Sequence, residues 1–239
     1  MSDLLALEWQ RLAGSALLWL PATLAAYSLG LWLHARANAA PLANPLLIAI
    51  VLIGAVLLMT STPYADYFAS AQILHFLLGP ATVALALPLW RHLDTIKRYF
   101  WPVMLSIAAG SVIAAGSAVA IAYALGASRA TLLSLAPKSV TTPIAISLAE
   151  QIGGLPALAA VIVLLTGAVG AVLGRWLLNL LNVMDWRARG LAVGTVSHGI
   201  ATARAFQVNE TAGAFSGLAM GVNGLLTALT LPWLVKFFG

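Results

Sequence analysis

The chain has 239 residues, of which 62% are hydrophobic and only 8% are charged. A soluble domain keeps about 25–35% charged residues on its surface, so this composition excludes a soluble globular protein and also a disordered chain. Apolar runs continue for tens of residues, which predicts an all-α membrane protein. The net charge of +5 comes from scattered cations and not from a basic run, so we expect contacts with the lipid bilayer and no nucleic acid partner.

About 20 apolar residues are needed to cross the hydrocarbon core as a helix. Such runs predict seven to eight hydrophobic segments within a single membrane domain, 1–239: 11–34, 45–60, 68–90, 99–124, 127–151, 155–182, 188–206 and 211–237. The stretch Met1–Gly30 has some features of a signal peptide. Its apolar run reaches Leu33 without a polar cleavage region, which favours a first membrane span.

The distribution of cations bears on how these segments cross the membrane. With eight full crossings, the cations of the first half would lie on one side (Arg36, Arg91, Lys97, Arg98) and those of the second half on the other (Arg175, Arg187, Arg189, Lys236). Cations normally gather on the cytoplasmic side. The conflict disappears if segment 127–151 is broken or re-entrant and makes no single net crossing. We then expect a cytoplasmic C-terminus.

The same assumption turns 45–124 and 155–237 into two three-segment units of opposite orientation. A short internal echo agrees with it, since GPAT at 79–82 and GIAT at 199–202 lie 120 residues apart. Inverted repeats around broken helices and a central polar site are the architecture of secondary transporters. We therefore predict inverted three-segment repeats.

The segment 127–151 contains the most polar stretch, Pro137-Lys138-Ser139-Val140-Thr141-Thr142-Pro143. Two prolines remove helix hydrogen bonds, and irregular backbone at membrane depth is tolerated only where protein or water covers it. A Pro-kinked helix with hydroxyls bonded to the preceding turn is the plainer alternative. A lysine with three hydroxyls between two prolines favours a donor-rich anion site instead, formed by Lys138, Ser139, Thr141 and Thr142.

A second polar stretch, GLAVGTVSHGIATAR at 190–204, holds the candidate residues His198, Thr202 and Arg204. His198 changes charge near neutral pH and is a candidate for proton coupling. Alternatively, the histidine is a satisfied core residue and Arg204 extends to the membrane interface. A third stretch, 77–88, places Thr82 between two prolines. Two interpretations are equally supported: a Pro-kinked helix without a binding role, and a role for Thr82 in binding.

Several absences narrow the function. Every Asp and Glu lies at or near a segment end, so no carboxylate is available in the membrane middle for an ion relay. There is no cysteine, and no nucleotide-binding, zinc-protease or paired-carboxylate motif occurs. We therefore expect no enzyme activity, no catalytic residues, no metal and no cofactor.

Four stretches closely resemble the LrgB/CidB family: LLGPATVALALPLW (77–90), PKSVTTPIA (137–145), GLAVGTVSHGIATARAF (190–206) and GAFSGLAMGVNG (213–224). The resemblance extends from about Pro45 to the C-terminus. It implies a bacterial inner-membrane protein that acts with a smaller LrgA/CidA partner. Family members are described as holin- and antiholin-like modulators of murein hydrolases, and related plastid proteins carry glycolate and glycerate.

Two hypotheses follow. The first is a secondary carrier of small monocarboxylates of the glycolate, glycerate, lactate or pyruvate type, with Lys138 or Arg204 pairing the carboxylate and Ser139, Thr141 and Thr142 holding the second oxygen. The second is a holin- or antiholin-like pore or regulator that acts through assembly, a homo-oligomer included. In the second case the glycine-rich faces would matter more than the buried cations.

Overall fold

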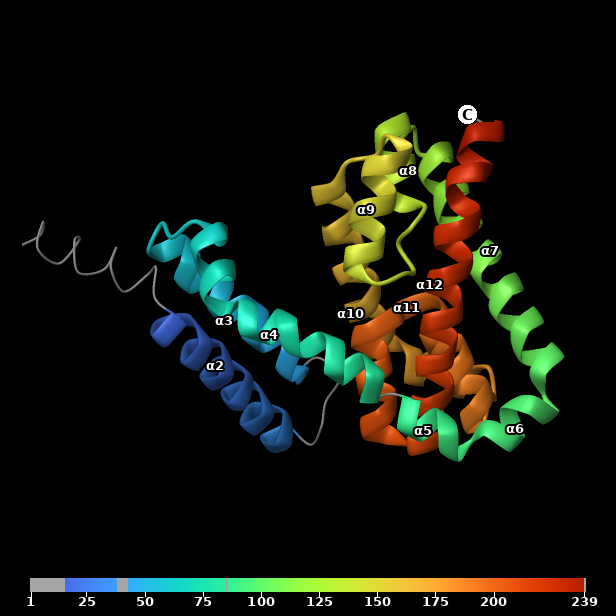
Figure 1. Cartoon of the computed structure of the whole chain (residues 1–239), viewed down its shortest axis with the longest axis horizontal. Helices are drawn as coiled ribbons and strands as arrows, with labels where there is room; N and C mark the ends of the chain where they lie inside the picture. Colours follow the sequence, from blue (N-terminus) through green and yellow to red (C-terminus); the bar gives the residue numbers. More distant parts are fainter. Residues whose placement is uncertain (1–15, 38–42, 85, 239) are drawn as a thin grey trace, which may run out of the picture. The chain divides into compact units, whose positions relative to one another are not determined.

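A computed structural model describes residues 16–37, 43–84 and 86–238, so the predicted first segment is described from Ala16 onward. The chain divides into two compact units, Met1–Ala84 and Leu85–Gly239, and each unit is described by itself. Every regular element of the described residues is a helix (Figure 1). The all-α prediction is confirmed at this level.

The first unit consists of α2 (Ala16–Arg36), α3 (Pro45–Met59) and α4 (Tyr64–Ala84). The side-chain oxygen of Asn44 accepts a hydrogen bond from Leu46 N at 2.9 Å and so caps α3, which begins at a proline, as helices often do. Trp19 on α2 is fully buried and packs edge-on against Tyr67 on α4, with 5.6 Å between the ring centroids. The ring contact joins α2 to α4, and Ala26 of α2 packs with Ala49 and Ile53 of α3.

The second unit contains the remaining helices: α5 (Ala86–Arg91), α6 (Leu93–Arg98), α7 (Phe100–Ala124), α8 (Arg129–Leu135), α9 (Thr142–Ile152), α10 (Pro156–Leu180), α11 (Trp186–Val208) and α12 (Glu210–Phe238). Among the described residues, three helices are long and apolar enough to cross a membrane, namely α7, α10 and α12. Large apolar side chains of α7 are widely exposed; Val112 is 71% exposed and Ile113 is 68% exposed. Such a surface suits lipid and not water.

Cations gather at one end of this unit, where α5 and α6 lie across the bundle (Figure 1). Arg98 and Arg187 both lie over the ring of Tyr99, and Arg91 pairs with Glu210 at 2.7 Å. Asp185 caps α11, and the hydrogen bond from Arg187 lowers the pKa of its carboxyl to about 2. Residues from four chain segments therefore meet at this end.

The segment 127–151 forms a helical hairpin that enters and leaves at the same level. Helix α8 ends at Leu135, residues 136–141 are not helical, and α9 runs back from Thr142. Leu155 N, just past α9, donates to Ser134 Oγ at 2.7 Å, so the end of α8 lies beside the end of α9, and residues 136–141 lead from there to the start of α9. We call this the first hairpin and residues 136–141, which lead to the start of α9, its tip. The 11 residues of α9 separate its two ends by about 16 Å, close to half the thickness of a hydrocarbon core.

Helix α11 also turns back on itself, which corrects the prediction of one crossing over 188–206. His198 has φ 43° and ψ −140°, a non-helical conformation inside the helix. Before His198, Gly190 meets Ala212 and Gly194 meets Ser216, so this half runs parallel to α12. After it, Thr202 bonds Ser216 and Phe206 meets Gly213, so the second half runs antiparallel. We call the two halves the second hairpin and His198 its tip.

The two hairpins differ from the predicted repeats in their boundaries. The first predicted repeat, 45–124, is divided between the two compact units, and the three-segment repeat and the single domain over 1–239 stay predictions. Within the second unit, each hairpin is followed by a long helix: α8–α9 by α10, and α11 by α12. The first hairpin starts at the end opposite to the cation cluster, and the second starts at that cluster. This is an inverted hairpin-and-helix arrangement.

Candidate functional site at the two hairpin tips

Asn223, near the middle of α12, joins the two hairpin tips. Its side chain is fully buried, and its Nδ2 donates to the main-chain oxygens of Ser139 and Thr195, both at 3.0 Å. Thr195 O is the carbonyl that would bond Gly199 N in an unbroken helix, and the turn at His198 removes that partner. One amide thus satisfies a freed carbonyl of each tip, as irregular backbone at membrane depth requires.

The two residues that Asn223 binds occupy equivalent places in a short repeat. SVTTPIA at 139–145 and TVSHGIA at 195–201 are offset by 56 residues, with three identities and two exchanges of Ser and Thr. Ala145 and Ala201 are both fully buried at the start of the helix that follows each tip. The contact to Asn223 therefore pairs equivalent carbonyls of two related hairpins.

His198 is buried at the second tip, where its ring reaches α10. Its Nε2 lies 2.8 Å from Val163 O, and since a carbonyl only accepts, Nε2 carries a hydrogen. The ring occupies the space left by Gly167; a Cβ there would lie 2.8 Å from His198 Cε1. Gly170 likewise makes room for Ser197. These two glycines allow α10 to approach the tip.

Lys138 places a cation at the first tip. It is half-buried, and its Nζ donates to Ser139 Oγ at 3.1 Å. Neither of the ion pairs that the structure describes, Arg91–Glu210 and Arg187–Asp185, involves Lys138. The structure thus brings Lys138, Ser139 and His198 together at the meeting point of the hairpins.

Three further predicted residues lie at the start of a helix or along it. Thr141 and Thr142 are half-buried at the first residues of α9, and the Thr141 side chain makes no capping bond. Thr202 is buried one turn beyond His198, and its hydroxyl bonds His198 O at 2.7 Å and Ser216 Oγ at 2.8 Å. Thr141 and Thr142 begin the helix that leaves the first tip, and Thr202 holds the second hairpin to α12.

Two predicted residues remain, Arg204 and Thr82. Arg204 lies further along α11 and donates to Gln207 Oε1 at 3.1 Å in an exposed bond. Thr82 belongs to α4 in the first unit, and its side chain lies outside the described residues. Their roles in binding stay predictions. Among the described residues, no three His, Cys, Asp or Glu side chains gather as metal ligands.

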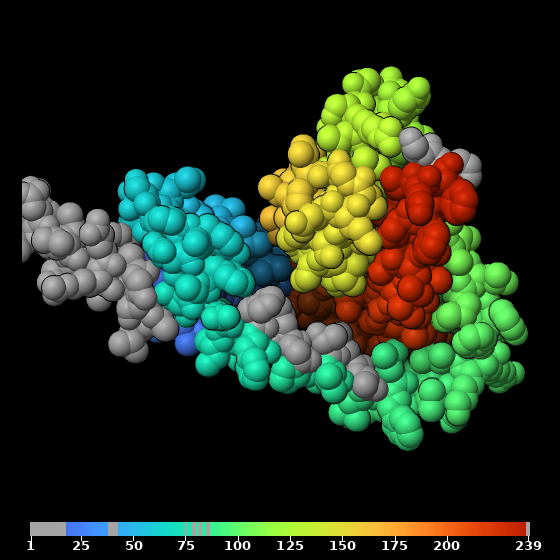
Figure 2. Space-filling view, turned by 45° about the horizontal axis from the view of Figure 1, so that its top comes forward, coloured from blue at the N-terminus to red at the C-terminus, as the bar shows by residue number. Residues whose placement is uncertain are grey.

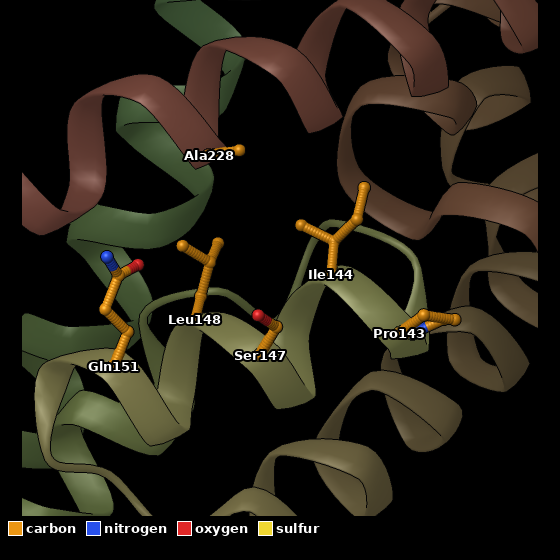
Figure 3. Close-up of a pocket in the computed structure, with 6 residues that line it drawn as sticks. All are labelled: Pro143, Ile144, Ser147, Leu148, Gln151 and Ala228. Carbon is orange, nitrogen blue, oxygen red and sulfur yellow. The ribbon is translucent and has the colours of Figure 1, made fainter.

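A groove of about 400 Å³ lies between α9 and α12, next to the first tip. Figure 2 shows α9, in yellow, and α12, in red, side by side on one face of this unit. In Figure 3, Ala228 faces the groove from α12, opposite the side chains of α9. The groove is lined by Pro143, Ile144, Ser147, Leu148, Gln151 and Ala228. It therefore extends along α9 from its first turn toward its last.

Asn223 is not among the site residues predicted from the sequence, although the structure places it at the junction of the tips. Its signal was a single amide in the middle of an apolar, glycine-rich segment, because a polar group there needs internal partners. Ser216 was missed as well, and one serine in such a segment carries too little information to be singled out. The repeat at 139–145 and 195–201 was visible in the sequence.

Comparisons with known proteins match nearly the whole chain. Residues 23–237 match the model of a family described as the LrgB-like family. "Antiholin-like protein LrgB" of Bacillus subtilis (strain 168) is 33% identical over 217 residues, which cover 91% of this chain and 94% of that protein. "Uncharacterized protein YwbG" of the same strain is 37% identical over 194 residues, covering 81% and 86%. No solved structure matches.

Proposed function

This chain belongs to the LrgB-like family, and from that premise we propose that it is a carrier of small monocarboxylate anions. The observation that carries the proposal is the meeting of two hairpin tips beside Lys138. Transporters bind anions at broken helices, where helix N-termini point their positive dipole ends at the substrate. Here α9 and the second half of α11 both begin at the tips.

The inventory of groups suits a small monocarboxylate. One ammonium, at Lys138, matches one negative charge, and the hydroxyls of Ser139, Thr141 and Thr142 supply further hydrogen bonds. The groove along α9 supplies a route to the first tip for a molecule of a few carbon atoms. We propose Lys138 as the residue that pairs with the carboxylate.

The end that carries most cations defines the proposed orientation. Six cations lie in the elements at or near that end: Arg91, Lys97, Arg98, Arg175, Arg187 and Arg189. In a bacterial inner membrane this end would face the cytoplasm. Because α11 turns back, α12 makes the crossing and carries Lys236 to the other end (Figure 1). We therefore propose a C-terminus outside the cytoplasm, in place of the cytoplasmic one expected from the sequence.

The test is an exchange assay with the full chain in liposomes. We expect liposomes loaded with unlabelled lactate to accumulate labelled glycolate, lactate or pyruvate, and empty liposomes without protein to accumulate none. A second set contains the LrgA/CidA-like small membrane protein that we propose as a partner. Absence of exchange in both sets would overturn the carrier proposal.

The groove gives a prediction of its own. Ala228→Phe should fill the space between α12 and α9 and lower exchange by about tenfold or more, because the added ring exceeds the room that an alanine leaves. Leu229→Phe is the matched control, since this neighbouring side chain is 60% exposed. We expect the control to exchange at the wild-type rate. Equal exchange by both variants would exclude the groove as the route.

A second candidate, an antiholin-like regulator, is supported by the names of the Bacillus relatives. A pore or a regulator of pores acts on membrane permeability and needs no selectivity for carboxylates. The same liposomes, loaded with a fluorescent dye, separate the two functions. A carrier exchanges the acid and retains the dye, whereas a pore releases both.

A further inference from the structure

Asn223 leaves one polar atom unused at the junction of the tips. Both hydrogens of Nδ2 are donated to the carbonyls of Ser139 and Thr195, which assigns the orientation of the amide. The other amide atom, Oδ1, is buried, and no donor among the described residues reaches it. A buried acceptor without a partner is unfavourable and calls for a ligand or a water molecule.

The position of this acceptor relative to Lys138 limits what the ligand can be. Lys138 Nζ lies 3.1 Å from the hydroxyl of Ser139, and Asn223 Nδ2 lies 3.0 Å from the main-chain oxygen of the same residue. A cation and an unused acceptor therefore flank a single serine. A small molecule that contacts both groups needs a negative charge for the ammonium and a hydrogen-bond donor for the amide oxygen.

We infer that Asn223 Oδ1 accepts the hydroxyl hydrogen of a 2-hydroxy monocarboxylate whose carboxylate pairs with Lys138. This inference rests on the proposed carrier function and names the residue that selects among its substrates. A 2-hydroxy acid carries the donor on the carbon next to the carboxylate. A 2-keto acid offers only an acceptor there, so two oxygen lone pairs would face each other, and an unsubstituted acid leaves Oδ1 unsatisfied.

The test compares three acids that differ only at the second carbon. Unlabelled lactate, pyruvate and propionate compete with labelled lactate for exchange by the full chain in liposomes. We expect lactate to compete at about tenfold lower concentration than either of the other acids, the effect of one unmade buried hydrogen bond. Equal competition by all three acids would overturn the inference and would leave Oδ1 to a bound water.

A variant then assigns the preference to Asn223. Asn223→Ala should bring the ratio of the lactate and pyruvate constants close to one. Ser134→Ala is the matched control, because Ser134 is also fully buried and loses two hydrogen bonds, to Ala130 O and Leu155 N, neither of which involves Lys138 or Asn223. The control should keep the wild-type ratio. A preference that survives in Asn223→Ala would contradict the inference.

The outcomes for the two proposals are separable. Exchange of none of the acids by the wild-type chain would refute the carrier function itself. Exchange without preference for the hydroxy acid would refute only the role of Asn223. If Asn223→Ala does not fold, as judged by its unfolding temperature in detergent, the wild-type competition series decides the matter alone.

Discussion

Lys138→Ala is expected to reduce monocarboxylate exchange by about a hundredfold or more. An ammonium in contact with a carboxylate in a partly buried site contributes about 4 kcal/mol, and each 1.4 kcal/mol corresponds to a factor of ten. The measurement is the initial rate of labelled lactate uptake into loaded liposomes. Lys236→Ala is the matched control, because it removes a lysine near the end of α12, far along the helix from Asn223.

A separate measurement distinguishes loss of function from loss of fold. The described hydrogen bond of the Lys138 ammonium goes to its neighbour Ser139. Removing a half-buried charge of this kind should leave the unfolding temperature in detergent unchanged or raise it. A variant that keeps more than a tenth of the wild-type rate would show that another group pairs with the substrate.

Gly194→Ala is expected to lower the free energy of unfolding by about 3 kcal/mol or more. A Cβ at this position would overlap Ser216 O and lie 2.7 Å from Ser216 Cα, both of them main-chain atoms of α12. Main chain cannot rotate away as a side chain can, so the first half of α11 and α12 must separate. The unfolding temperature of the purified protein in detergent measures the effect.

Gly116→Ala on α7 is the matched control, because no atom lies within 4 Å of the place that the alanine methyl group would occupy. Alanine is the better helix former by up to about 1 kcal/mol, so this variant should be as stable as the wild type or slightly more stable. Equal unfolding temperatures for the two variants would refute the close contact of α11 and α12. Comparing Gly194→Ala with Gly116→Ala also tests whether a glycine in this protein allows two of its own helices to pack closely.

The sequence predicted the helical class and the location of the broken segment for identifiable reasons. Long runs of apolar residues indicate membrane helices, because the hydrocarbon core accepts apolar side chains and offers no water to hydrogen-bond an irregular backbone. Pro137 and Pro143 interrupt hydrogen bonding within 127–151, and the structure has non-helical residues between α8 and α9. The cation distribution favours no single net crossing by this segment, and this stays a prediction, while the bond between Ser134 and Leu155 brings the ends of α8 and α9 together.

The second hairpin was not predicted, because its reversal depends on one residue. His198 is not a proline or a glycine, so its positive φ has no local sequence signal. The conformation is held by contacts from other helices: Val163 O binds the ring, and Asn223 binds the carbonyl of Thr195. Contacts between residues far apart in the chain cannot be read from a hydropathy pattern.

The structure brings candidate residues together where polarity and backbone breakage coincide in the sequence. Lys138, Ser139 and His198 meet at the tips because a lysine or histidine inside an apolar segment needs internal partners. Arg204 has a different environment, since helix geometry carries it away from the tip and toward Gln207. Polarity alone could not separate these two cases.

Asn223 holds both tips by main-chain carbonyls, and this has a consequence for how such chains diverge. A hydrogen bond to a main-chain carbonyl oxygen does not depend on which side chain is present at position 139 or 195. Side chains at these two positions can therefore change while the hydrogen bonds that join the two hairpins are kept. Under the proposed carrier function, a replacement of Ser139 would alter the binding site without separating the hairpins.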